Sequence, residues 1–275
     1  MIESPRLDLP VQQIIDLYNL KGLSSIKIGA IYNVSHTAIL DLLQRNGQKR
    51  KSIASYLKKY TENESYFELI DIPEKAYFLG FFFADGCNSK GNSTIVIKIG
   101  EKDKYILEKF RDSIKSNGKI AISLSKNPKH QNMSIFRIHS DKISRDLYKL
   151  GAGDNKSLTL KFPTRVPNHL LSHFVRGYFD GDGCISMAKQ NPTLAHIAIC
   201  LTQEFGEKLK EILLELNINS RVAKVGGIHR LDFGGRQQCI KFAKWLYKDA
   251  NGLFLNRKYD RLKKLEDYQK IITPK

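Results

Sequence analysis

The sequence has few cysteines, no long hydrophobic run and a shortage of acidic residues. Its four cysteines, Cys87, Cys184, Cys200 and Cys239, lie far apart and form no Cys-x-x-Cys pair, which excludes a zinc ribbon and disfavours a disulfide scaffold. The longer apolar runs, such as residues 76–84, fall short of the ~18–20 residues that a membrane span needs. No basic stretch followed by an apolar one opens the chain, so a secretory signal is not expected. We therefore expect an intracellular protein in a reducing compartment: the cytoplasm or nucleoid, or an organelle.

Positive charge is what the chain has in excess. Its 275 residues include 45 Lys and Arg against 28 Asp and Glu, a formal net charge of +17. A hydrophobic fraction of 41% is that of a folded protein rather than a disordered tail, and the length corresponds to roughly two domains of about 100–150 residues. The charge favours a polyanionic partner, with nucleic acid as the first candidate.

Three short helices are predicted in the first fifty residues. Apolar residues repeat at helical spacing within 11–20, Ser24 or Ser25 can cap a second helix that runs to Tyr32, and Ser35 can cap a third that ends near Gly47. Residues 1–60 hold nine Lys and Arg against four Asp and Glu. This stretch resembles the helix-turn-helix domains of resolvases and transposases in Gly-Leu-Ser-Ser-x-x-Ile at 22–28 and in Asn-Gly at 46–47.

We predict a helix-turn-helix DNA-binding domain at 1–52, followed by a polar linker at 53–72; the alternative is a basic packing module. The N-terminal residues of the second helix of such a motif lie nearest the base edges. The predicted contacts are Ser35, His36 and Thr37 for bases, and Arg45, Lys49, Arg50 and Lys51 for phosphates.

From residue 73 onward one order of elements occurs twice. The first copy is predicted as helix 74–85, strands 87–90 and 93–100, helix 101–116, strands 118–126 and 133–139, and helix 141–150. The second is helix 168–182, strands 184–189 and 194–202, helix 203–217, strands 220–225 and 228–233, and helices 235–249 and 256–269. An α-ββ-α-ββ-α unit that occurs twice predicts an α+β fold of two pseudo-symmetric repeats, at 73–162 and 163–275, in one monomeric chain.

The first helix of each copy carries small residues four positions apart. These are Gly80 and Ala84 in the first copy and Gly177 and Gly181 in the second. Residues four apart share one helix face, and small-residue stripes let two helix backbones approach closely. The two helices are therefore predicted to pack against each other.

An aspartate occupies the last turn of each of these helices. Asp85 and Asp182 each precede a glycine suited to a left-handed helix stop. A carboxylate is disfavoured at the negative C-terminal end of a helix, so bringing two such ends together favours a bound cation. Few carboxylates, with room for water and phosphate, match Mg²⁺.

The segments 78–86 and 175–183 resemble the paired signature motifs of the LAGLIDADG homing endonucleases in their single-chain, two-motif form. The resemblance covers about residues 74–270 and departs from the family pattern at Phe83 and Arg176. It implies that Asp85 and Asp182 bind Mg²⁺, or another hard divalent cation such as Mn²⁺ or Ca²⁺. It further implies that the residue before each aspartate contributes its backbone carbonyl: Ala84 and Gly181. Asp180 is expected to be structural.

The resemblance also implies basic or polar residues around the metal. Lys98 matches such a position on the second strand of the first repeat, whereas Cys200 stands at the equivalent position of the second repeat. Lys156 and Lys258 match a lysine found late in each repeat. The alternative for each lysine is an ordinary solvated surface residue.

Two saddle-shaped antiparallel sheets are expected to supply the base contacts, because a two-stranded ribbon fits the major groove. Alternate residues of a strand share a face. The predicted contacts are Ser123 with Ser125, Arg137 with His139, and Arg230 with Asp232.

The expected function is a site-specific DNA endonuclease that makes a staggered double-strand break by metal-assisted phosphodiester hydrolysis, with double-stranded DNA as partner. Two alternatives stay open. One is an intron-encoded maturase that binds RNA; the other is a catalytically silent DNA-binding regulator, which would be expected to lack Asp85 or Asp182. Since the chain starts with Met and ends without splice-junction residues, we expect a freestanding or intron-encoded protein rather than an intein.

Overall fold

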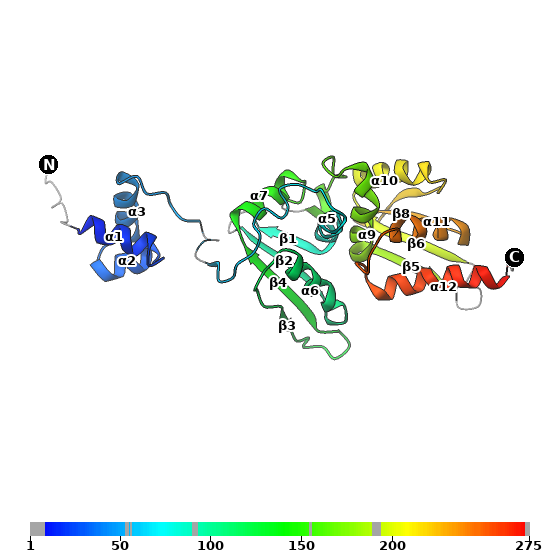
Figure 1. Cartoon of the computed structure of the whole chain (residues 1–275), viewed down its shortest axis with the longest axis horizontal. Coiled ribbons are helices and arrows are strands. Elements are labelled where there is room, and N and C mark those ends of the chain that lie inside the picture. The colour runs from blue at the N-terminus through cyan, green and yellow to red at the C-terminus, as the bar shows by residue number, and fades with distance from the viewer. Residues whose placement is uncertain are drawn as a thin grey trace. The chain divides into compact units, whose positions relative to one another are not determined.

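The computed structural model describes residues 9–52, 55, 57–89, 93–153, 156–188 and 194–272. The chain divides into two compact units, Met1–Lys58 and Lys59–Lys275, drawn in Figure 1, and each is described by itself. Within the described residues, no helix has the length and apolar character needed to cross a bilayer.

The first unit holds the three predicted helices: α1 (Val11–Asn19), α2 (Ser25–Tyr32) and α3 (His36–Arg45). The side chain of Ser24 accepts a hydrogen bond from the backbone N–H of Lys27, and that of Ser35 from Ala38, so both serines are the N-caps that the sequence predicts. The helices enclose a small core of Ile14, Tyr18, Ile28, Ile39 and Leu43.

The second unit repeats one order of elements, as predicted. The first repeat contains α5 (Pro73–Asp85), β1 (Gly86–Ser89), β2 (Thr94–Gly100), a 3₁₀ turn (Glu101–Asp103), α6 (Lys104–Ser113), β3 (Ala121–Ser123), β4 (Met133–His139) and α7 (Asp141–Lys149). A short helix α8 (Lys156–Thr159) and a 3₁₀ turn (Asn168–Leu170) follow. The second repeat contains α9 (Leu171–Asp182), β5 (Gly183–Met187), β6 (Ala195–Leu201), α10 (Gln203–Glu215), β7 (Arg221–Val225), β8 (Ile228–Gly234), α11 (Arg236–Tyr247) and α12 (Asn256–Ile272).

Each repeat builds one four-stranded antiparallel sheet. The strand orders are β1-β2-β4-β3 and β5-β6-β8-β7, the same order in both repeats. The pairing registers also correspond, because Gly86 pairs with Ile97 in the first sheet and Gly183 pairs with Ile199 in the second. This correspondence lets positions in the two repeats be matched strand by strand.

Helices α5 and α9 pack against each other and join the two repeats (Figure 1). A Cβ atom at Gly80 would lie 1.9 Å from the carbonyl oxygen of Phe174, and one at Gly177 would lie 1.9 Å from that of Tyr77. Only glycine fits such an approach of one helix backbone to another. The close packing predicted from the small-residue stripes is confirmed.

The second half of the predicted linker is part of the folded unit, so that prediction was wrong there. Tyr66, Phe67 and Ile70 are buried in the core of the second unit. The backbone N–H of Asn63 donates to the carbonyl of Ile114 at 2.7 Å, and the Tyr66 hydroxyl lies 2.5 Å from that of Ser113. Three apolar side chains in a polar segment suffice to dock it. Positions 53, 54 and 56 of the linker lie outside the described residues.

Candidate active site

The two aspartates end the central helices, as predicted, but the glycines after them are not left-handed stops. Gly86 and Gly183 have φ values of −80° and −86°, with extended backbone. Each glycine instead lies under an aromatic ring of its own helix: a Cβ at Gly86 would be 2.2 Å from Phe82 Cδ2, and one at Gly183 would be 2.1 Å from Phe179 Cδ2. The chain therefore passes directly from helix to strand beneath the ring.

The close approach of α5 and α9 continues into their last turns. A Cβ at Gly181 would lie 2.3 Å from Ala84 Cβ and 3.0 Å from Asp85 Oδ2. Burial raises the pKa of Asp85 to about 6, with a further contribution from the negative charge of Asp182. Burial likewise raises the pKa of Asp182. Two carboxylates thus lie near the interface of the helix ends, in surroundings that disfavour their negative charge.

Two lysines cover the carbonyl ends of the same helices. Lys156 Nζ donates to the carbonyl oxygens of Phe83, at 2.6 Å, and Ala84, at 2.5 Å. Lys258 Nζ donates to the carbonyls of Phe179 and Asp180 at 2.6 and 2.7 Å, and reaches that of Gly181 at 3.3 Å. Burial lowers the pKa of both ammonium groups, for Lys258 to about 8. These lysines offset the negative helix ends and are not solvated surface residues.

The donor set at the helix ends consists of oxygen atoms. Within the described part of the chain, no three His, Cys, Asp or Glu side chains are grouped for a metal. Two carboxylates whose charge is disfavoured fit a hard divalent cation that completes its shell with water and phosphate. The carbonyls of Ala84 and Gly181, which the resemblance assigns to the metal, already accept hydrogen bonds from lysine.

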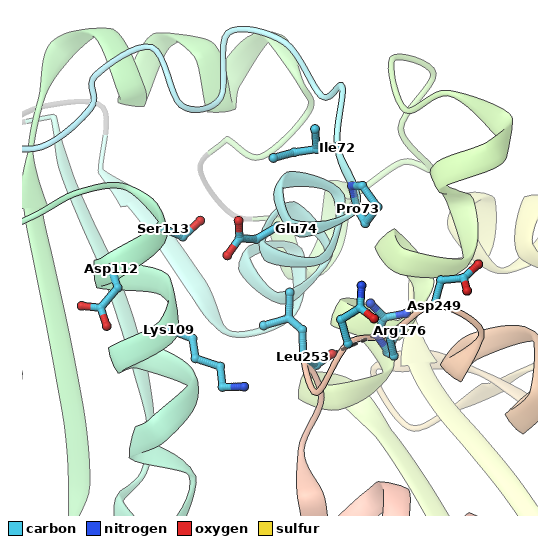
Figure 2. A pocket seen from close by; sticks show the side chains of 11 residues that line it. Ile72, Pro73, Glu74, Lys109, Asp112, Ser113, Arg176, Asp249 and Leu253 are labelled. Carbon is cyan, nitrogen blue, oxygen red and sulfur yellow. Dashed lines mark hydrogen bonds between the residues drawn. The ribbon is translucent and has the colours of Figure 1, made fainter.

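The side chains of Asp180 and Arg176 are buried and make structural contacts within the second unit. Asp180 Oδ2 accepts hydrogen bonds from the Tyr77 hydroxyl at 2.8 Å and from the Leu255 backbone at 2.9 Å. Arg176 is buried and donates to the carbonyls of Leu246 and Leu253. It borders a cavity between the start of α5, α6 and the loop before α12 (Figure 2), whose lining contains none of the predicted site residues.

Both the sequence and the fold are similar to those of known proteins. Residues 170–245 match the family model described as a LAGLIDADG-like domain. This match lies in the second repeat, from the 3₁₀ turn before α9 into α11. Its fold is similar to that of the LAGLIDADG meganuclease I-AabMI bound to uncleaved DNA (TM-score 0.50, 15% identity, 74% of this chain and 91% of that one). It is also similar to the homing endonuclease I-WcaI bound to its DNA recognition sequence (TM-score 0.51, 11% identity, 72% and 91%).

One curated protein matches at the level of sequence. It is a probable translation initiation factor IF-2 of Methanocaldococcus jannaschii, 24% identical over 210 residues. The match covers 70% of this chain but only 16% of that protein, so the chain corresponds to a small part of this relative's length.

The two repeats differ beside their aspartates. Lys98 and Cys200 each follow the isoleucine that pairs with the glycine after the aspartate, so the register confirms their equivalence. Lys98 is exposed on the outer face of β2. Cys200 is connected to the helix of Asp182 through Tyr178, whose hydroxyl donates to the Cys200 carbonyl at 2.9 Å.

The outer faces of the two sheets carry five of the six DNA contacts that the sequence analysis places on them. Arg137 is exposed and His139 half-buried, while Ile138 between them is buried, so the strand alternates as expected. Ser123 is exposed at the end of β3. Arg230 Nε lies 2.9 Å from Asp232 Oδ2, and His196 Nε2 lies 3.3 Å from Asp232 Oδ1.

Ser125 does not share the strand face of Ser123, which corrects the prediction. The strand expected at 118–126 ends at Ser123. The Ser125 backbone N–H donates to Asn132 Oδ1 at 3.0 Å, and its hydroxyl donates to the carbonyl of Asn127 at 2.9 Å. These bonds form a turn, and strand pairing stops before it.

In the first unit, the structure leaves most of the predicted contacts accessible. Six are exposed: Ser35, His36, Thr37, Arg45, Lys49 and Arg50. Lys51 is different, because its ammonium donates to the Tyr18 carbonyl and lies 4.7 Å from the centre of the Tyr18 ring. Lys51 is thus anchored to the core of its own unit, a contact for which the sequence has no signal.

Proposed function

We propose that this chain is a site-specific DNA endonuclease that makes a staggered double-strand break with a hard divalent cation. The observation that carries the proposal is the pair of carboxylates, Asp85 and Asp182, at the abutting ends of α5 and α9. A net charge of +17 and a fold similar to DNA-bound LAGLIDADG proteins support it.

In this proposal the residues of the chain have distinct tasks. Asp85 and Asp182 hold the cation, which is Mg²⁺ or a substitute such as Mn²⁺ or Ca²⁺. Such an ion lowers the pKa of a bound water and stabilises negative charge on a phosphate. Lys98 neutralises charge that grows on the phosphate during hydrolysis. Lys156 and Lys258 stabilise the site without contacting DNA. Each ammonium donates to helix-end carbonyls and offsets negative charge beside the aspartates.

DNA binding in this proposal uses two kinds of surface. The outer faces of the two sheets contact the core of the site through side chains such as Arg137 and Arg230. The first unit acts as a helix-turn-helix module, with the start of α3 nearest the bases and Arg45, Lys49 and Arg50 on phosphates. The basic excess makes binding strongly dependent on salt. The chain binds double-stranded DNA as a monomer, because it contains both repeats.

A second candidate is a DNA-binding protein of the same fold without catalysis. The observation that favours it is the occupation of the Ala84 and Gly181 carbonyls by lysine ammonium groups. If those lysines supplied all the positive charge at the helix ends, no cation would be needed there. The two candidates differ in one outcome, which is cleavage.

The experiment is incubation of the purified chain with a randomised-site double-stranded DNA library in Mg²⁺, with EDTA as the control. Sequencing of the cut ends is expected to return one site family with a constant stagger between the two strands. Enrichment of bound sites without any metal-dependent cutting would favour the second candidate.

A further inference from the structure

The second repeat has Cys200 instead of a lysine at the position that matches Lys98. The residue paired with Cys200 on the neighbouring strand, however, is a cation. In the first sheet Lys98 on β2 pairs with Ile135 on β4. In the second sheet the matching pair is Cys200 on β6 and Arg230 on β8. Each pair therefore contains one cation and one uncharged residue, on opposite strands.

Directly paired residues of antiparallel strands point to the same face, with Cβ atoms about 4.5–5.5 Å apart. A long side chain on either strand therefore reaches the same region above the sheet. Arg230 lies on the outer face, since its neighbour Leu231 is buried while the Arg230 side chain is 41% exposed. Burial and the carboxylate of Asp182 raise the pKa of the Cys200 thiol, whereas the guanidinium of Arg230 lowers it.

We propose that Arg230 is the catalytic cation of the second repeat and takes the role that Lys98 has in the first; this inference rests on the proposed endonuclease function. Arg230 contacts the phosphate of one DNA strand and stabilises charge that develops there. Its ion pair with Asp232 uses Nε, which leaves the two terminal amino groups for the phosphate. Asp232 is then a positioning residue for Arg230 rather than a contact to a base.

The test uses a cleavable site from the library, with each DNA strand labelled separately. Lys98→Ala and Arg230→Ala are expected to slow cleavage of opposite strands. Each loss is expected to be about 10-fold, less than the ~10²–10³-fold lost with a buried transition-state donor, because both side chains are partly solvated. Lys208→Ala is the matched control, since it removes an exposed cation that pairs with Glu211 on α10.

A double variant that copies the Lys98–Ile135 pair into the second sheet makes the test sharper. Cys200→Lys combined with Arg230→Ile rebuilds the Lys98–Ile135 arrangement in the second sheet. It is expected to recover most of the cleavage that Arg230→Ile alone loses on that strand. Failure of this recovery, or an equal effect of Arg230→Ala on both strands, would overturn the inference.

The outcomes also separate this inference from the proposed function. A wild-type chain that cuts neither strand would refute the function itself. A wild-type chain that cuts both strands, with Arg230→Ala as active on each strand as Lys208→Ala, would refute only the role of Arg230.

Discussion

Replacing Gly177 by alanine tests the contact that joins the two repeats. The added Cβ would lie 1.9 Å from the carbonyl oxygen of Tyr77 and 2.7 Å from the backbone nitrogen of Phe81, whereas ordinary contact begins at 3.4 Å. Both neighbours are backbone atoms of α5, so no side-chain rotation relieves the overlap. The two helices must move apart along their whole contact.

Two effects of opposite sign decide how much Gly177→Ala changes the free energy of unfolding. Alanine in a helix is favoured over glycine by up to ~1 kcal/mol, while overpacking a core costs about 1–3 kcal/mol. Because the blocked atoms belong to the backbone, we expect the overpacking to exceed the gain, with a net loss of about 1–2 kcal/mol in the free energy of unfolding. For a domain of this size, that corresponds to a Tm lower by about 2–8 °C.

The assay is thermal unfolding of the full chain followed by circular dichroism, with Gly227→Ala as the control. A Cβ at Gly227 meets nothing within 4 Å, so that variant should unfold near the wild-type Tm. A Tm for Gly177→Ala equal to or above that of the wild type would refute the argument that backbone contact between α5 and α9 requires glycine.

Three further predictions follow from the same structure. Affinity for the DNA site should fall by about 10³–10⁵ between 50 and 200 mM salt if 6–10 phosphates are contacted; a flat response in a filter-binding titration would contradict the role given to the +17 charge. A chain that starts at Lys59 should still cleave DNA in Mg²⁺, but it should bind roughly 10²-fold more weakly and protect a shorter stretch of DNA. An unchanged footprint would exclude DNA contact by the first unit. Lys258→Met should lower the free energy of unfolding by about 1–3 kcal/mol, because it leaves buried carbonyls of α9 unpaired. Urea unfolding measures this against Lys263→Met, which replaces an exposed lysine of α12, and equal stabilities would refute the expectation.

Local patterns predicted the elements well. Serine caps, helical spacing and glycine breaks placed α1 to α3 and both repeats, because these signals act within a few residues. The packing of α5 on α9 was also predictable, since the stripes at Gly80 and Gly177 are readable in each helix alone. The second half of the predicted linker was wrongly assigned, because its segment is mostly polar and contains only a few apolar residues such as Tyr66 and Phe67.

Contacts between distant segments were not predictable from sequence. The bonds of Lys156 and Lys258 to helix-end carbonyls span 72 residues or more, and only the resemblance to a family placed these lysines near the aspartates. The pairing of Cys200 with Arg230 depends on strand register across a helix and a hairpin, which no local signal fixes. Ser125 was misassigned because turn hydrogen bonds, rather than strand propensity, end β3.

The most direct test of the central claim compares the wild-type chain with the Asp85→Asn, Asp182→Asn double variant on one DNA site recovered from the library. Binding is measured in EDTA, and cleavage is measured separately in Mg²⁺. We expect the variant to bind the site about as well as the wild type but to cut neither strand, because the acids hold the cation and do not dock the DNA. Cleavage by the double variant at the wild-type rate would contradict it.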